Sequence, residues 1–227
     1  MKYIKKIIPS CAILFISASS YGALLPVPLV DLTLHYTVSI DDTATLKTSS
    51  TSSASDADTS AISSMGATLE HSVPFIPNIM INMQADPKEA STGNVEYAFD
   101  DITFFYSLPI PFMDLRFGVT DRSFKGSLYD SSNTLKSLTS SSNLSYLEAN
   151  IDIPFVGISV GAIVHSPLGQ SDLITDQDMY IGYELGYNVT LQLGMRSTQL
   201  QQKENLFQVN ADVDTTTTYL RASLALL

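Results

Sequence analysis

The sequence predicts an all-β protein, an antiparallel up-and-down transmembrane β-barrel of about ten strands that crosses a bacterial outer membrane. Three observations carry this prediction. Segments of roughly ten residues alternate between apolar and polar side chains, as strands with two different faces do. Short turns built on Pro-Phe or Tyr-Asn alternate along the chain with long polar stretches rich in Ser and Thr. After the first 22 residues there is no apolar run of the ~18 residues that a membrane-spanning helix needs, which leaves a closed barrel as the way to cross lipid.

The N-terminus, residues 1–22, is predicted to be a secretory signal peptide. Three lysines precede a short apolar stretch from Ile7 to Ile16. Ser20-Tyr21-Gly22 then offers small residues for cleavage before Ala23. The apolar stretch is too short to span a membrane. The barrel domain is therefore predicted to occupy residues 23–227.

The charge of the chain limits its partners. The full chain carries 12 Lys+Arg and 23 Asp+Glu, a net charge of −11; losing three leader lysines leaves 9 basic residues against 23 acidic ones, or −14. Such an acidic surface repels phosphates and excludes nucleic acid as a partner. Acidic outer loops are expected instead to hold divalent cations, which also bridge anionic lipid headgroups. The single cysteine, Cys11, lies in the leader, so the mature chain is predicted to have no disulfide and no thiol nucleophile.

The first predicted strand runs from Val30 to Ile40 with unbroken alternation. Apolar residues occupy the even positions, and polar residues, including His35, occupy the odd ones. Its eleven residues suit a tilted strand that crosses hydrocarbon, whereas strands of soluble proteins are usually about five or six residues long. A soluble periplasmic β-protein is the alternative interpretation of this pattern.

Four hairpins and one last strand follow. Their turns are predicted at Ser72–Phe75, Leu108–Phe112, Ile153–Gly157 and Gly186–Asn188, and the polar loops at Asp41–Ser63, Asp86–Asn94, Lys125–Asn143, Ser166–Gln177 and Gln199–Asp214. The last strand, Tyr219 to Leu226, pairs with the first and leaves no open edge. Ten strands place both ends of the chain on one side, as single-chain bacterial barrels require. Eight or twelve strands remain possible, with Ser64 to His71 the weakest segment.

Proline and aromatic residues define the orientation of the predicted barrel. Proline cannot donate to a β-ladder, and five prolines fall at the short connections: Pro74, Pro77, Pro109, Pro111 and Pro154. The short turns are therefore predicted to be periplasmic and the long loops external. Four aromatic residues at these turns are expected near one depth and are predicted to form an interfacial girdle, the alternative being aromatics packed into a core: Phe75, Phe112, Phe155 and Tyr187.

Two segments, Leu69–Ile79 and Ile153–Gly161, together with the run Gly182–Gly186, resemble a family of proteobacterial outer-membrane β-barrel proteins of unassigned function. The resemblance covers most of the chain, from Leu32 onward. It implies an outer-membrane location, with outer-membrane lipid and the outer-membrane assembly machinery as partners, and it transfers no functional residue. Such barrels usually end in an aromatic residue that this machinery recognises, whereas this chain ends in leucine.

Charged residues on the polar faces are predicted to point into the lumen: Arg116, Arg122, Glu148, Asp152, Glu184, Arg196 and Arg221. Arg116 and Asp152 lie near turns of neighbouring strands and are placed to meet at similar depth. Small barrels are mostly filled by their own side chains. An ion-pair network that fills the interior is therefore favoured over a charged lumen that selects solutes.

Catalytic and metal-binding patterns are weak. His35, His71 and His165 fall at different depths and cannot share a metal ion. His165-Ser166 invites a hydrolase interpretation, but neighbouring residues of a strand point to opposite faces, and no Gly-x-Ser-x-Gly motif is present. No catalytic residue, cofactor or metal ligand is predicted, and the chain is predicted not to be an enzyme.

These observations together predict an outer-membrane barrel with a structural or surface-interaction role. Its external loops are expected to be acidic and Ser/Thr-rich, and its polar lumen largely filled. A narrow passive channel for small solutes is the first alternative, and a membrane-embedded hydrolase is the second. The classes differ in what the lumen must contain: packed ion pairs, a continuous path, or a nucleophile beside a base.

Overall fold

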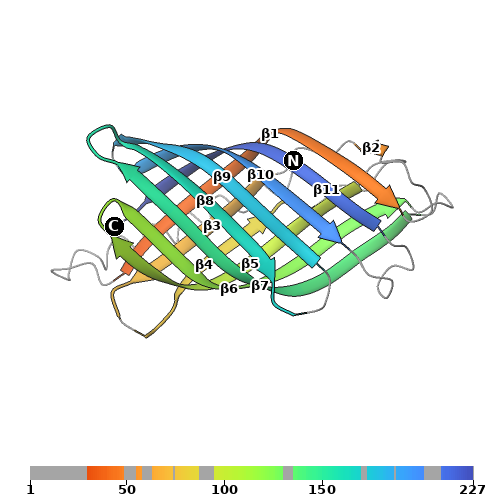
Figure 1. Ribbon diagram of the computed structural model, residues 1–227, viewed down its shortest axis with the longest axis horizontal. Helices are drawn as coiled ribbons and strands as arrows, with labels where there is room; N and C mark the ends of the chain where they lie inside the picture. Colours follow the sequence, from red (N-terminus) through yellow and green to blue (C-terminus); the bar gives the residue numbers. More distant parts are fainter. Residues whose placement is uncertain are drawn as a thin grey trace, which may run out of the picture.

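The computed structural model describes residues 30–48, 55–57, 63–73, 75–86, 95–129, 135–169, 173–186, 188–201 and 211–226. The predicted signal peptide, 1–22, lies outside these residues, as do Tyr187 and most of the predicted loops. Figure 1 shows tilted strands wound into one barrel. The strands are β1 (Val30–Thr48), β2 (Ser55–Ala57), β3 (Ser63–His71), β4 (Asn78–Gln84), β5 (Val95–Ile110), β6 (Met113–Tyr129), β7 (Leu135–Ile153), β8 (Ile158–Pro167), β9 (Leu173–Gly186), β10 (Val189–Gln201) and β11 (Ala211–Ala225).

The sheet is antiparallel and closed. From β3 to β11 each strand pairs with its neighbour in sequence, β3 pairs with β1, and β11 pairs with β1 to complete the circle. The three-residue β2 pairs only with the outer part of β1, at Ala44 to Leu46, and adds nothing to the wall. The wall therefore has ten strands, which confirms the predicted fold. Ser64 to His71, the weakest predicted segment, lies within β3.

The short turns all use a residue with a positive φ angle. Phe75, Phe112 and Phe155 have φ values of 68°, 64° and 71°, and Asn188 has 62°. This left-handed region is unusual for a bulky side chain such as phenylalanine. It allows a strand to reverse its direction within a few residues. Each predicted turn therefore contains one non-glycine residue in the left-handed conformation, and in three of the four turns this residue is Phe.

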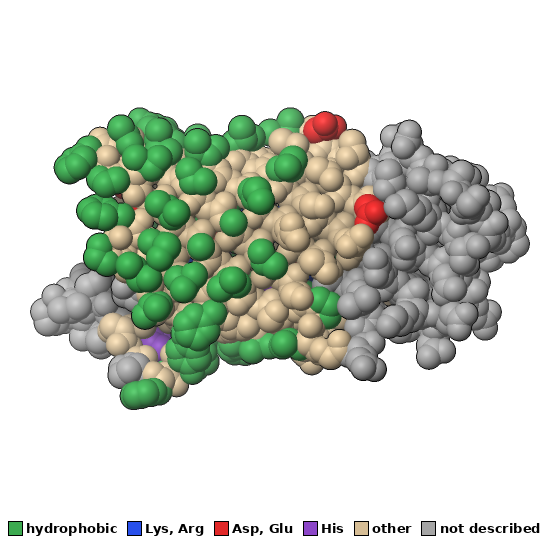
Figure 2. All heavy atoms as spheres, viewed as in Figure 1, with side chains coloured by type: hydrophobic (Ala, Val, Ile, Leu, Met, Phe, Trp, Pro, Cys, Tyr) green, Lys and Arg blue, Asp and Glu red, His purple; other side chains and the backbone are tan. Residues whose placement is uncertain are grey.

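The outward face of the wall has two halves. In the half nearer the short turns it is apolar, and Figure 2 shows the hydrophobic side chains gathered there. Exposed examples on separate strands are Val38, Phe104, Phe117, Leu147, Val160, Ile181, Leu193 and Leu220. Farther along the same strands the outward positions become polar, as in the change from Met195 to Ser197 and Gln199 on β10.

The strands continue past this change in polarity, so the sequence-based boundaries are wrong at the outer end. A loop was predicted from Lys125 to Asn143, but β6 runs to Tyr129 and β7 begins at Leu135. The outward positions there are Ser, Thr, Asn or Lys, and apolar alternation ends while hydrogen-bonded pairing continues. A hydrophobic pattern detects only the part of a strand that contacts an apolar medium.

The inward face carries charged, polar and aromatic side chains. One buried cluster consists of Phe105, Tyr146, Ile163 and Tyr180, with Met80 packed against it. A second, farther from the short turns, joins the rings of Tyr97, Phe99 and Phe124. Among the residues that the structure describes, no helix is long and apolar enough to span a bilayer.

Candidate functional site in the barrel lumen

Arg122 lies at the centre of the lumen's charged network. Its side chain is 1% exposed, and Nε and Nη2 donate to the two carboxylate oxygens of Asp101, each at 2.8 Å. Nη2 also donates to Oδ2 of Asp176 at 3.1 Å. Because Arg122 is on β6 and Asp176 is on β9, this contact crosses the interior of the barrel. The guanidinium carbon lies 4.5 Å from the ring centroid of Phe99, a cation–π geometry.

Further ion pairs extend this network to β10 and β11. Arg196 Nη2 lies 3.3 Å from Oδ2 of Asp178, and Arg221 Nη2 lies 3.8 Å from the same oxygen. Tyr219 donates to Oδ1 of Asp178 at 2.6 Å. We call the following six residues the outer cluster: Arg122, Arg196, Arg221, Asp101, Asp176 and Asp178. Its three guanidinium groups offset its three carboxylates, so the cluster as a whole is neutral.

A second group, the turn-side cluster, surrounds Arg116. The guanidinium lies 2.7 Å from Glu70, 2.8 Å from Asp114 and 3.3 Å from Glu148. Glu148 also accepts hydrogen bonds from the hydroxyls of Tyr146 and, at 2.9 Å, Tyr180. One cation therefore faces three carboxylates, so this cluster has an excess of negative charge.

Two glycines allow tyrosines to reach these carboxylates. Tyr180 on β9 lies opposite Gly161 on β8, and a Cβ atom at Gly161 would overlap the ring. Tyr219 on β11 lies opposite Gly194 on β10 in the same way. Each ring lies across its glycine, so its hydroxyl reaches the acid one strand farther on, Glu148 on β7 or Asp178 on β9. The alternation of the sequence predicts both glycines on the polar face, but it does not indicate that a tyrosine ring packs across each of them.

Replacement of Gly161 with valine is expected to lower the free energy of unfolding by about 1–3 kcal/mol, because the new side chain displaces the ring of Tyr180. The measurement is denaturant unfolding of the refolded barrel in lipid vesicles. Ala162→Val, on the next residue and facing outward, is the matched control and is expected to leave stability unchanged. Equal stability of the two variants would contradict the packing of this ring on the glycine.

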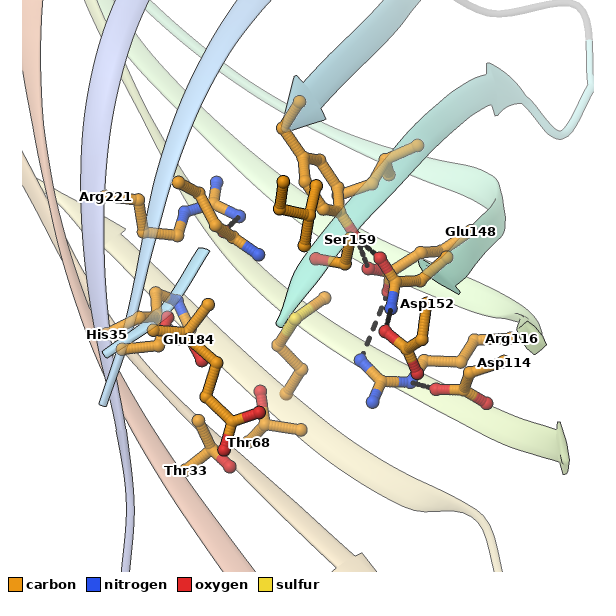
Figure 3. Close-up of a pocket in the computed structure, with 18 of the residues that line it drawn as sticks. Thr33, His35, Thr68, Asp114, Arg116, Glu148, Asp152, Ser159, Glu184 and Arg221 are labelled. Atoms are coloured by element: carbon orange, nitrogen blue, oxygen red, sulfur yellow. Dashed lines mark hydrogen bonds and ion pairs between the residues drawn. The ribbon is translucent and has the colours of Figure 1, made fainter. Parts of the chain in front are cut away.

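A cavity of about 530 Å³ lies between the two clusters. It begins at the short-turn end, where Phe155 and Gly157 line it, and extends inward to Ile163 and His165. Figure 3 shows Arg221 and Glu184 on one side and Glu148, Asp152 and Arg116 on the other. A separate cavity of about 30 Å³ lies nearer the outer end. Arg196 lines both cavities and therefore lies between them.

The structure brings five of the seven predicted lumen residues into the two clusters: Arg116, Arg122, Glu148, Arg196 and Arg221. Asp152 and Glu184 line the cavity, and neither forms an ion pair with another described residue. Four further carboxylates of the clusters were not predicted as lumen residues: Glu70, Asp101, Asp176 and Asp178. Asp176 was assigned to the loop Ser166–Gln177, although it follows the same alternation as Asp178 and Tyr180 and so could have been found.

The expected pair of Arg116 and Asp152 does not form. Arg116 lies opposite Glu148 in the β6–β7 register, and Asp152 accepts instead from Nδ2 of Asn150 at 3.1 Å. The backbone N–H of Asp152 donates to the carbonyl of Phe112, so Asp152 is level with the β5–β6 turn. Neighbouring strands of a barrel are staggered, and counting residues from two turns therefore does not give equal depth.

The aromatic residues predicted to form a girdle lie at the short turns. Phe75, Phe112 and Phe155 are exposed there, and Phe155 also lines the mouth of the cavity. Tyr187 lies outside the described residues. An interfacial girdle therefore remains a prediction for these side chains.

The residues of the hydrolase interpretation point away from each other. His165 is buried on the inward face with Nδ1 3.6 Å from Asp176, whereas Ser166 is exposed on the outward face. The Ser166 carbonyl accepts a hydrogen bond from the hydroxyl of Ser145. Within the described part of the chain, no group of three or more His, Cys, Asp or Glu side chains is arranged to hold a metal ion.

The fold and the distribution of side chains define the class of protein. A closed sheet with apolar outward residues and charged inward residues has the polarity of a membrane barrel, the reverse of a soluble protein. The chain is a bacterial outer-membrane β-barrel protein. A soluble periplasmic protein does not fit, because the Leu, Ile and Val side chains predicted to face lipid point outward and are exposed.

The chain is similar to several solved structures. The outer membrane protease OmpT from Escherichia coli matches with a TM-score of 0.50 at 8% identity, over 86% of this chain and 96% of that one. The translocator domain of the autotransporter NalP from Neisseria meningitidis matches with a TM-score of 0.43 at 9% identity, over 97% and 96%. Neisserial surface protein A matches with a TM-score of 0.41 at 10% identity, over 85% and 96%. No family model and no curated protein matches the sequence significantly. At these identities the similarity concerns the fold alone.

Proposed function

We propose that this barrel has a structural or surface-interaction role and that its lumen does not conduct. The observation that carries the proposal is the contact of Arg122 with Asp176 across the interior, together with its two bonds to Asp101. A solute on its way through the lumen must displace this guanidinium from its carboxylates. Leaving a buried charge without its partner is costly, so the closed arrangement is the stable one.

The polar outer half of the wall supports a role at the cell surface. Outward positions of β6 and β10 beyond the apolar half, such as Ser123 and Gln199, are exposed and hydrophilic. The strands therefore extend beyond the hydrocarbon. The acidic, Ser/Thr-rich loops, where divalent cations are predicted to bind, lie outside the described residues, and we propose these loops as the contacting parts.

We also propose that the protein is not an enzyme. The His-Ser pair that a hydrolase interpretation would use, His165-Ser166, is divided between the two faces of β8. In the other adjacent pair, His71-Ser72, the ring nitrogens of His71 contact the Val73 N–H and the Pro77 carbonyl. His165, the base that a hydrolase would need, lies among the buried ion pairs rather than beside an exposed hydroxyl. A nucleophile requires a base within hydrogen-bond reach.

A narrow passive channel is the second candidate, favoured by the cavity of about 530 Å³. Its charged walls resemble those that select ions in pores. The outer cluster lies at the inner end of this cavity, since Asp101 and Arg196 line it there. A channel would therefore require the ion pairs of this cluster to separate.

Planar-bilayer recordings distinguish the two candidates. The unmodified barrel is expected to give no discrete conductance steps, and the double variant Asp101→Ala/Arg122→Ala is expected to conduct because its inner seal has been removed. Asp100→Ala/Lys125→Ala removes an exposed ion pair from the same two strands and is the control. Steps from the unmodified protein would favour the channel, and a silent double variant would show that Arg122 does not close the lumen. Heat-dependent gel mobility confirms that each variant is folded.

A further inference from the structure

The mouth of the large cavity is strongly acidic. The carboxylates of Asp114, Glu148, Asp152 and Glu184 line it, and Glu70 lies beside them on Arg116. The single guanidinium of the turn-side cluster contacts Glu70, Asp114 and Glu148, and Asp152 and Glu184 form no ion pair with another described residue. Asp31 adds to this charge, because it lies opposite Glu70 in the β1–β3 register. Like charges on paired strands are destabilising, so folding alone does not explain this arrangement.

The other cations of the lumen do not offset this charge. Arg196 and Arg221 line the cavity, but the three carboxylates of the outer cluster, Asp101, Asp176 and Asp178, neutralise them together with Arg122. The acidic excess therefore remains at the short-turn end. A cleft lined by one sign of charge and walled by low-dielectric material concentrates ions of the opposite sign. The volume, about 530 Å³, is within the usual range for small-molecule sites, about 300–1,000 Å³.

His165 provides an independent indication of a ligand at the inner end. It is 6% exposed and lines the cavity, and its buried Nε2 has no hydrogen-bond partner among the described residues. Buried polar atoms are rarely left without a partner. We assign the ring proton to Nδ1, which faces the carboxylate of Asp176. Nε2 is then an acceptor and requires an N–H or O–H donor.

We propose that this cavity binds a small organic polyamine that enters from the periplasmic end. One ammonium group lies among Asp152, Glu184 and Asp114 at the mouth, and an N–H group farther along the molecule donates to Nε2 of His165. The negative mouth disfavours an anion. The cavity also offers an acceptor at each end, which suits an elongated molecule with several donors. The barrel needs no open path to bind such a ligand, so this site goes beyond the proposed role of the protein.

Calorimetric titration of spermidine into the full-length refolded barrel, in an uncharged detergent at low salt, tests the proposal. Saturable binding of one spermidine per chain is expected. Glu184→Gln and Asp152→Asn are each expected to weaken it about tenfold, because each removes a charged acceptor. Both positions are exposed and outside the ion-pair clusters, so the variants are expected to fold. Asp121→Asn, an exposed carboxylate on the outward face of β6, is the control and is expected to bind as the unmodified protein does.

A second variant tests the inner end. His165→Phe removes the acceptor and is expected to weaken spermidine binding while leaving the weaker binding of methylamine, which reaches only the mouth, unchanged. Absence of saturable binding, equal affinity of Glu184→Gln and the unmodified barrel, or an equal loss with Asp121→Asn would overturn the proposal. These results are independent of conductance, so the site and the proposed role can fail separately.

Discussion

Replacement of Arg122 with methionine is expected to lower the free energy of unfolding by about 3–5 kcal/mol, the cost of removing one partner from a buried ion pair. Asp101 loses two hydrogen bonds and Asp176 loses one, and both carboxylates stay in the interior. Methionine fills most of the volume but carries no charge. Unfolding by denaturant in lipid vesicles measures the change.

Two comparisons separate the loss of charge from the loss of packing. Lys125→Met removes the cation of an exposed ion pair with Asp100 on the same two strands and is expected to have little effect. The triple variant Asp101→Leu/Arg122→Met/Asp176→Leu replaces Arg122 and both of its carboxylate partners with apolar side chains and is expected to recover much of the stability. If Arg122→Met and Lys125→Met are equally stable, the cross-lumen contact does not hold the barrel together.

The closed sheet could be predicted because lipid and lumen impose opposite demands on alternate residues. Val30 to Ile40 shows this, since each even position contacts an apolar medium and each odd one faces a polar interior. The Pro-Phe turns add a second, independent signal. Ten strands follow from these two patterns without any knowledge of contacts.

The ends of the strands could not be predicted in the same way. Beyond Val119 on β6 the outward side chains are polar, while the inward Phe124 is apolar. Here the outward residues are polar and the inward residue is apolar, the reverse of the arrangement within the membrane. A search for outward apolar residues therefore predicts a loop. The aromatic cluster of Tyr97, Phe99 and Phe124 was missed for this reason. Only backbone hydrogen bonding, which has no sequence signature of its own, shows that the strand continues.

The sequence also could not predict which charged residues pair with each other across the lumen. The stagger between strands decides that Arg116 lies opposite Glu148 rather than Asp152. The contact of Arg122 with Asp176 depends on closure of the entire barrel, since β6 and β9 are not neighbours. Charged positions on the inward face could thus be predicted, whereas their pairing could not.

The position of the membrane along the strands determines how strongly a charge on the outward face destabilises the barrel. On β10 the outward apolar residues run from Val189 to Met195, which covers about 20 Å along the strand. The strands tilt, so the height along the membrane normal is smaller still, below the ~25 Å that is usual for such barrels. Leu193 is then expected near the middle of the hydrocarbon, and Ser197 and Gln199 at or above its outer boundary.

Leu193→Arg is therefore expected to destabilise the folded barrel by about 2–4 kcal/mol in phosphatidylcholine vesicles, because it places a charge near the centre of the bilayer. Gln199→Arg, six residues farther along the same face of the same strand, is expected to cost only about 0–1 kcal/mol. Both side chains are exposed, so packing within the protein contributes little to the difference. Equal costs at the two sites would mean that lipid covers the polar half of the wall as well, and that this half does not project from the membrane.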